Sequence, residues 1–239
     1  MDGNFSPAAP SAGGHLSAFP AVEYVVRTIA QTAVDNETYF GDLDAVVGDG
    51  DFGYSMARGF EIVLADWDAI DRTDVGTFLK KVALTITGRI GGTSGPIWGT
   101  AFIRAGVAAG DRTAVTADDA VAMLRAAIEG IKTRGQSDVG DKTLLDALIP
   151  AVDRLEAELA AGAGGQAALE AAATTARERA EATRELIAKR GRAAYTGERS
   201  IGTLDAGAVA VAVMAERVAG GWADHATPTV TPTTPEEAP

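Results

Sequence analysis

The segment at residues 43–53, LDAVVGDGDFG, places Asp44, Asp49 and Asp51 close together in the chain. Carboxylates this near to one another repel unless cations neutralise their charge. A ligand set made only of oxygen atoms suits hard cations such as Mg²⁺ or Ca²⁺. The intervening glycines allow backbone turns that direct several side chains inward. We therefore predict a metal site on these three aspartates.

Two other structures could account for these aspartates. An EF-hand loop that began at Asp49 would need glycine at its sixth position and glutamate at its twelfth, where the chain has Tyr54 and Phe60. A loop that began at Asp51 would have Ile62 at its twelfth position. The EF-hand is therefore excluded. The alternative without a metal, a turn whose aspartates cap the following helix, stays open.

Three further connections between predicted helices, here called joints, carry polar or glycine-rich sequence. Residues 91–95, GGTSG, precede a predicted helix, where backbone amides and hydroxyls suit phosphate oxygens. They do not form a Walker A motif, and small residues also mark close helix packing. Residues 134–143 line a site or cap a helix through Asp141. Residues 191–200 carry two arginines suited to phosphate, or form an ordinary solvated loop.

Apolar stripes at helical spacing dominate the rest of the chain and predict an all-α fold. The segment 208–213 alternates as a strand would, but it is rich in alanine and is predicted to be helical. Short connections favour antiparallel neighbours, hence an eight-helix antiparallel up-down barrel or bundle. In that topology the joints at 44–53, 91–95, 134–143 and 191–207 gather at one end. The predicted helices span 20–38, 53–69, 74–89, 94–109, 117–133, 142–161, 165–189 and 206–222.

The composition of the chain separates its two ends from a central domain and disfavours several classes of function. Residues 1–18 and 226–239 lack apolar content and are predicted to be flexible tails around a single domain at 19–225. The chain has no cysteine, and its two histidines lie near its ends, which disfavours thiolate or histidine metal sites. A net charge of −12 disfavours a nucleic-acid partner. With no long apolar run and no signal-like N-terminus, we expect no membrane span and a cytoplasmic location.

Four motifs in order carry a resemblance to a known family. They are LDAVVGDGDFGYSMARGF, GGTSGPIWGTAFIRAG, RGQSDVGDKTLLDAL and GRAAYTGERSIGTLDAGA, and together they span residues 43–208. The chain resembles the nucleotide-binding L subunit of dihydroxyacetone kinases. The resemblance implies a barrel of eight antiparallel helices that binds ADP or ATP at one end through two Mg²⁺ ions on Asp44, Asp49 and Asp51.

The resemblance also implies which other residues form the nucleotide site. Thr93 and Ser94 would contact phosphate, Gly135 and Leu144 would flank the base, and Arg192 would reach the nucleotide. The predicted nucleotide-binding residues are Phe52, Gly53, Ser55, Thr93, Ser94, Gly135, Leu144, Arg192, Asp205, Ala206 and Gly207. No catalytic residue beyond the metal ligands is expected in this chain.

In the family, a separate subunit or domain binds the ketone substrate on a histidine, and nothing in this chain resembles that part. Activity is therefore expected only with a substrate-binding partner. A phosphotransferase-system carrier protein and a second copy of the chain are further candidate partners. Phe52 stands where members that receive phosphate from that system often carry histidine, and Ser55 stands where many carry asparagine. The absence of histidine at position 52 favours ATP over a phosphocarrier as the phosphoryl donor.

Other functions remain compatible with these residues. One is the nucleotide domain of a fatty-acid kinase, which phosphorylates a carboxylate held by a lipid-binding partner. Another is a nucleotide-loaded coregulator of a transcription factor, and a third is a helical scaffold without a ligand. The partner that the chain recruits would separate the first two, and Mg²⁺-dependent nucleotide binding would exclude the third.

Overall fold

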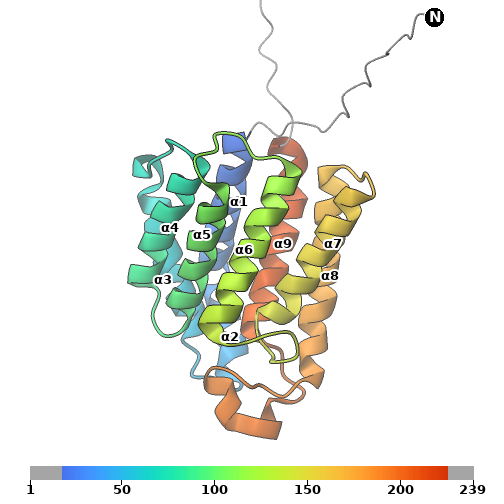
Figure 1. Cartoon of the computed structure of the whole chain (residues 1–239). Coiled ribbons are helices and arrows are strands. Elements are labelled where there is room, and N and C mark those ends of the chain that lie inside the picture. Colours follow the sequence, from blue (N-terminus) through green and yellow to red (C-terminus); the bar gives the residue numbers. More distant parts are fainter. Residues whose placement is uncertain (1–17, 226–239) are drawn as a thin grey trace, which may run out of the picture.

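A computed structural model describes residues 18–225, whose regular secondary structure is all helical, with no β-strand (Figure 1). The expected tails lie outside the described residues, except that Ala18 begins the first helix. Three short 3₁₀ segments occur in the joints: η1 Trp67–Ala69, η2 Thr183–Glu185 and η3 Arg192–Ser200. The α-helices are α1 Ala18–Asp35, α2 Glu37–Ala45, α3 Phe52–Ala65, α4 Val75–Arg89, α5 Ser94–Ala109, α6 Ala117–Gly135, α7 Leu145–Ala160, α8 Gly165–Ala182 and α9 Ala206–His225.

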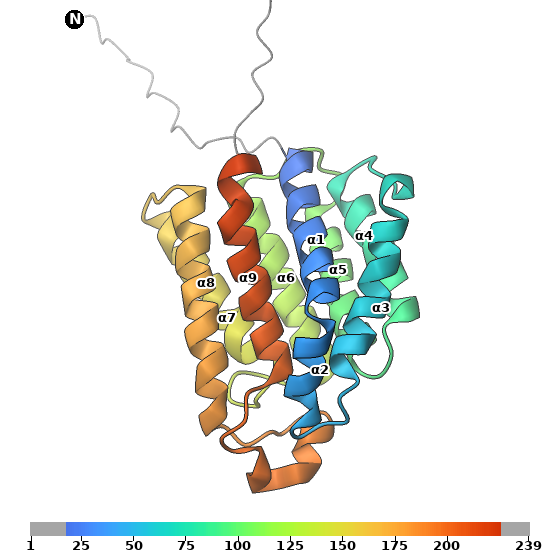
Figure 2. The ribbon, with the colours of Figure 1, turned by 180° about the vertical axis from the view of Figure 1, so that it is seen from behind.

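The long helices form the predicted antiparallel up-down barrel. Successive helices from α3 to α9 pack side by side, and α1 closes the ring between α9 and α3 (Figures 1 and 2). Eight helices of 14 to 20 residues make up this ring. The ring buries one large core cluster, in which Phe40, Phe60 and Phe78 are fully buried. The all-α prediction is confirmed.

The additional short helix α2 was not predicted, since the predicted helices leave residues 39–52 unassigned. The predicted helix 20–38 breaks at Asn36, whose backbone (φ −110°, ψ 20°) leaves the helical region. The chain then continues as α2 below α1 and carries Asp44 to the end of the barrel (Figure 2). Two other predicted helices are also shorter in the structure, because 53–69 ends at Ala65 and 165–189 ends at Ala182.

The ambiguous segment 208–213 is helical, as predicted. It lies in α9, which contacts α1, α2, α7 and α8, so that successive residues are buried on more than one side. This burial explains why its apolar pattern does not follow a single helical face. A capping box begins α6: the Thr116 hydroxyl accepts from the Asp119 N–H at 3.1 Å, and the Thr116 N–H donates to the Asp119 carboxylate at 3.0 Å.

No helix within residues 18–225 is both long enough and apolar enough to cross a membrane.

Candidate metal and nucleotide site

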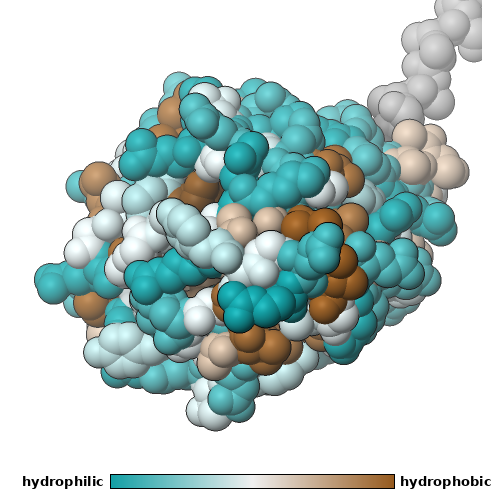
Figure 3. Space-filling model, turned by 90° about the horizontal axis from the view of Figure 1, so that it is seen from below, coloured by the Kyte–Doolittle hydropathy of each residue, from teal (hydrophilic) through white to brown (hydrophobic). Residues whose placement is uncertain are grey.

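The four polar joints lie together at one end of the barrel, the lower end in Figure 1. Arg192 of η3 forms ion pairs with Asp49 and Asp51 in the joint between α2 and α3. Gly91, before α5, lies beside the Ser55 hydroxyl of α3. Gly207, in α9, lies against Leu144, just before α7. The prediction that these joints gather at one end of the barrel is confirmed. Figure 3 shows this end from below.

The three predicted metal ligands form one cluster. One carboxylate oxygen from each of Asp44, Asp49 and Asp51 lies within 4.8 Å of the other two. Asp44 is in the last turn of α2, and its carbonyl accepts from the Gly48 N–H at 2.6 Å, which turns the chain back toward it. Gly50 follows with a φ of 76°, a conformation that glycine adopts without strain. The turn thus directs three acidic side chains to one point.

The electrostatics of this cluster suit a cation. Burial and then the neighbouring Asp49 carboxylate raise the pKa of Asp51, and the Arg192 guanidinium opposes them only in part. The part of this shift that comes from Asp49 and Asp44 reflects repulsion among the carboxylates, which a bound cation would relieve. All of the donors are carboxylate oxygens, which are the ligands of Mg²⁺ and related hard cations. The residues present therefore fit a magnesium site.

Hydroxyl and backbone N–H groups that could hydrogen-bond to phosphate lie at the same end of the barrel as the cluster. Thr93 and Ser94 stand at the start of α5, where the first backbone N–H groups of the helix have no partner within it. The Thr93 hydroxyl does not cap the helix, so it remains available to a ligand. Ser55 is buried in α3, and its hydroxyl faces Gly91. This arrangement is consistent with the phosphate roles expected for Ser55, Thr93 and Ser94.

Phe52 and Gly53 were expected to touch the nucleotide, but the structure shows other contacts for them. The Phe52 side chain packs inward against Phe40, with ring centroids 6.1 Å apart, and only its N–H faces Asp44, at 3.4 Å from Oδ2. Gly53 is buried against α2: a Cβ added there would lie 1.9 Å from the Glu37 carbonyl oxygen. Both residues hold α3 against α2 and so set the position of Asp51 relative to Asp44.

Gly53→Ala is expected to force α2 and α3 apart. The clash is with backbone atoms, which cannot move away as a side-chain end would, and overpacking of this kind costs about 1–3 kcal/mol of stability. Gly88→Ala is the matched control, because Gly88 is an exposed residue of α4 with nothing near the added Cβ. Thermal unfolding should show a lower Tm for Gly53→Ala and an unchanged or higher Tm for Gly88→Ala. Equal Tm values would contradict this account.

The other predicted nucleotide-binding residues lie at the end of α6, just before α7 and around the start of α9. Gly135 ends α6 and faces Ile97 of α5, whose Cδ1 would lie 3.2 Å from an added Cβ. Leu144 lies against Gly207, with 3.3 Å between its Cβ and an added Cβ. Asp205 caps α9 by accepting the Ala208 N–H at 2.6 Å. These residues lie at the same end of the barrel as the acidic cluster, near enough that the Asp44 carboxylate contributes to the electrostatics of Asp205.

Burial raises the pKa of Asp205 to about 7, with the Asp146 carboxylate adding to the shift and Lys142 opposing it. The folded chain therefore keeps a proton that the unfolded chain releases near pH 4. The stabilisation is fully present below pH 4 and is lost as the pH rises to about 7.

We expect the unfolding free energy of the wild type to fall, relative to Asp205→Asn, by an amount of order 1 kcal/mol per pH unit between pH 5 and 7. Asparagine keeps an oxygen acceptor for the Ala208 N–H but does not titrate. Urea unfolding of both proteins across this range measures the difference. Parallel stability curves would show that Asp205 ionises at its ordinary pKa.

Two residues at the joint between α6 and α7 were not singled out by the sequence. The Asp146 carboxylate, in the first turn of α7, accepts the Gly140 N–H at 2.6 Å and the Thr143 N–H at 2.7 Å, while Asp141 accepts the Asp138 N–H at 3.2 Å and does not cap α7. Lys142 is buried, and its ammonium donates to three backbone carbonyls. A polar loop sequence gives no signal for a buried lysine, because lysine is rarely buried.

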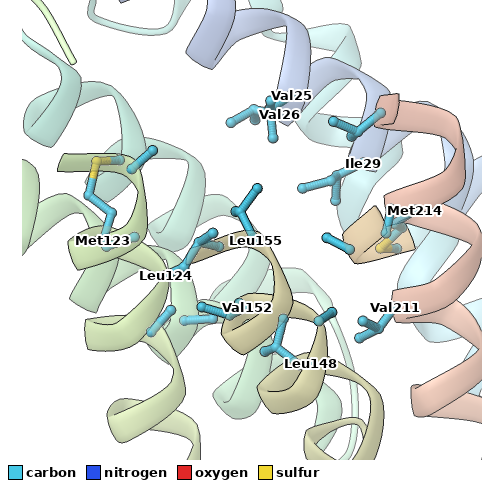
Figure 4. A pocket seen from close by; sticks show the side chains of 18 of the residues that line it. Val25, Val26, Ile29, Met123, Leu124, Leu148, Val152, Leu155, Val211 and Met214 are labelled. Carbon is cyan, nitrogen blue, oxygen red and sulfur yellow. The ribbon is translucent and has the colours of Figure 1, made fainter. Parts of the chain in front are cut away.

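The barrel also holds a cavity of about 340 Å³ away from the acidic cluster. Its walls are apolar, with Val25, Leu124, Leu148, Val211 and Met214 among the side chains that face it (Figure 4). Such walls offer no partner for phosphate or for a metal ion. The candidate nucleotide site is therefore the polar end of the barrel and not its interior.

Comparisons with known proteins agree with this architecture. The chain is 39% identical over 204 residues to the ADP-binding subunit DhaL of the PEP-dependent dihydroxyacetone kinase of Escherichia coli (strain K12), covering 85% of this chain and 97% of that protein. It is 39% identical over 192 residues to the L-erythrulose 1-kinase of Mycolicibacterium smegmatis, covering 80% of this chain and 33% of that enzyme.

Among solved structures, the dihydroxyacetone kinase of C. freundii in complex with AMP-PNP and Mg²⁺ superposes with a TM-score of 0.67 at 26% identity. The match covers 92% of this chain and 37% of that kinase, so this chain spans little more than a third of its length.

The helical barrel defines a class of all-α domain that is shared with the dihydroxyacetone kinase of C. freundii. A family model for the DAK2 domain matches residues 46–220, which include most of the barrel and three of the four polar joints in full. The chain belongs to the DAK2 domain family.

Proposed function

We propose that this chain is the Mg²⁺-dependent, adenine-nucleotide-binding subunit of a kinase that phosphorylates a small ketose such as dihydroxyacetone. The observation that carries the proposal is the cluster of Asp44, Asp49 and Asp51 beside glycine-rich joints at one end of the barrel. Similarity to the ADP-binding subunit DhaL over 85% of the chain supports it. The structure of the C. freundii kinase with AMP-PNP and Mg²⁺ supports the choice of ligand.

The three aspartates would hold two Mg²⁺ ions, which when bound neutralise the charge of the diphosphate or triphosphate. Phosphoryl transfer depends mainly on alignment and charge neutralisation. Thr93 and Ser94 would orient the phosphates through hydroxyl and backbone N–H groups at the start of α5. Arg192 would donate to a phosphate oxygen from η3. None of these groups needs to act as a base, so the proton of the substrate hydroxyl would be removed by the partner.

A substrate-binding subunit of the dihydroxyacetone kinase type is the proposed partner. The nucleotide end presents several exposed apolar side chains on a largely hydrophilic surface (Figure 3). They are Val46, Tyr54, Val139, Tyr195 and Ile201, of which Tyr195 is 90% exposed. Apolar and aromatic side chains around a polar site are typical of a surface that another protein covers. The phosphotransferase carrier, a homodimer and a cytoplasmic location remain predictions.

The phosphoryl donor is the finer question within this proposal. Phe52 favours ATP, whereas the E. coli relative is the subunit of a PEP-dependent kinase. The test is phosphorylation of dihydroxyacetone and erythrulose by this chain with a substrate-binding subunit, using either ATP or a phosphorylated carrier protein. We expect product with ATP. Product with neither donor would contradict the proposed function, and product with the carrier alone would reassign the donor.

A further inference from the structure

Lys142 connects two separate walls of the nucleotide end. It lies between α6 and α7 and is 3% exposed. Its Nζ donates to the carbonyl oxygens of Leu186 at 3.2 Å, Thr203 at 2.8 Å and Ser200. An ammonium group has three protons, and all of them are directed at the backbone of one segment, 186–203. The lysine therefore binds that segment as a cross-link and not as a surface charge.

The loop that carries Lys142 is itself held in a strained conformation. Lys142 has a φ of 61°, in the left-handed region that residues with a Cβ rarely adopt. The Asp146 carboxylate holds the N–H groups on both sides of it, those of Gly140 and Thr143. This clamp directs the lysine side chain away from α7 and toward the segment 186–203.

The segment 186–203 contains η3, and within residues 18–225 Lys142 is its only buried cation contact among several polar ones. The Lys189 N–H donates to the Asp141 carbonyl at 3.1 Å, and the exposed side chains of Lys189 and Arg190 pair with the Asp141 carboxylate. The Ser200 hydroxyl accepts the Ala188 N–H at 2.9 Å, and the Gly202 N–H donates to the Arg184 carbonyl at 2.8 Å. Positive φ values at Gly191 and Gly197 interrupt the helical backbone on either side of Arg192 and Tyr195. Without the ammonium, three carbonyls at the base of this segment would lose a charged donor.

We propose that Lys142 is a positioning residue for the nucleotide. It joins the loop that ends in Leu144, on the base side, to the segment that carries Arg192, on the phosphate side. It thereby sets the distance between the two groups that must contact one ligand. The inference rests on the proposed function and adds to it a residue that touches neither the base nor the phosphates.

Lys142→Met tests this role, with Lys189→Met as the matched control. Methionine keeps much of the length of the side chain but has no donor. Lys189 belongs to the same network, where its ammonium pairs with Asp141 at 3.1 Å, but it is exposed. We expect Lys142→Met to weaken Mg²⁺-dependent ADP binding by about tenfold or more, since hydrogen bonds from charged donors are among the stronger ones. Lys189→Met should change it by less than about twofold.

Amide hydrogen exchange, measured without nucleotide, separates positioning from general destabilisation. In Lys142→Met, exchange should accelerate within 136–144 and 186–203 and stay at the wild-type rate in α3, α4 and α5. Wild-type ADP affinity in Lys142→Met, or acceleration across all helices, would overturn the inference. If that variant does not fold, Lys142→Arg takes its place. A planar guanidinium cannot reproduce the three-way geometry, so wild-type affinity in Lys142→Arg would also overturn it.

The two proposals fail in different ways. If the wild-type chain binds no ADP in Mg²⁺, the proposed function is wrong, and the inference built on it is overturned with it. If the wild type binds ADP and Asp49→Ala does not, while Lys142→Met binds as the wild type does, the proposed function stands and only the role of Lys142 is refuted.

Discussion

Asp49→Ala and Asp51→Ala are each expected to abolish tight ADP binding, by a factor of about 100 or more, while the helical content stays at the wild-type level. Each variant removes one of three carboxylates whose oxygens lie within 4.8 Å of one another. A Mg²⁺ ion loses a charged ligand that water replaces poorly. Arg192 also loses a partner in each case, but a single exposed ion pair contributes little to stability. Displacement of a fluorescent ADP analogue, with circular dichroism on the same samples, measures both quantities.

The matched control is Asp42→Ala. Asp42 is an exposed aspartate of α2 that lies outside the cluster. Asp42→Ala removes the same charge from α2, the helix that carries Asp44, so a general electrostatic effect on the nucleotide would appear in this variant as well. We expect wild-type ADP affinity for Asp42→Ala. Wild-type affinity in Asp49→Ala and Asp51→Ala would remove the basis for the metal assignment.

The second large effect is that ketose phosphorylation requires a second, substrate-binding subunit. The purified chain is expected to bind nucleotide but to show no ketose kinase activity, and activity should appear when a substrate-binding subunit is added. The only histidines are His15 and His225, and His225 lies at the end of α9, where its ring stacks on Tyr24. No histidine of the described residues therefore lies at the nucleotide end to capture a ketone. Background ATP hydrolysis should also be slow, because no partner closes the site.

A coupled assay for ADP release, run with and without the partner, measures this requirement. The Asp49→Ala variant controls for contaminating kinases, since activity that belongs to this chain must disappear in it. Phosphorylation of dihydroxyacetone by the isolated wild-type chain, lost in Asp49→Ala, would contradict the division of labour. It would also mean that residues of this chain bind the ketose.

The sequence predicted the barrel because its apolar residues recur at helical spacing and its connections are short. It did not predict the break at Asn36, where the apolar pattern continues although the backbone turns. The three aspartates could be recognised from their spacing alone. Their meeting point depends on the turn at Gly48 and Gly50, which glycine permits but does not by itself specify.

Roles that depend on burial were harder to predict. The sequence predicted Gly53 as part of a glycine-rich loop that binds the ligand. The structure adds a packing role, because Gly53 lies against the Glu37 carbonyl where α3 meets α2. Lys142 reads as a solvated loop residue, and only the folded chain shows three carbonyls around its ammonium. Asp205 was predicted as a site residue, but a pKa raised to about 7 follows from the desolvation of its carboxyl in the folded chain. Long-range burial is not encoded in local spacing.

The central claim is that an adenine nucleotide binds at the acidic end of the barrel through Mg²⁺. Isothermal titration calorimetry of ADP into the wild-type chain, with Mg²⁺ in one experiment and excess EDTA in the other, tests it most directly. We predict one ADP per chain with Mg²⁺ and no measurable binding in EDTA. Equal affinity in both experiments would show that the three aspartates do not hold the metal for the nucleotide. Absence of binding in both would contradict the assignment itself.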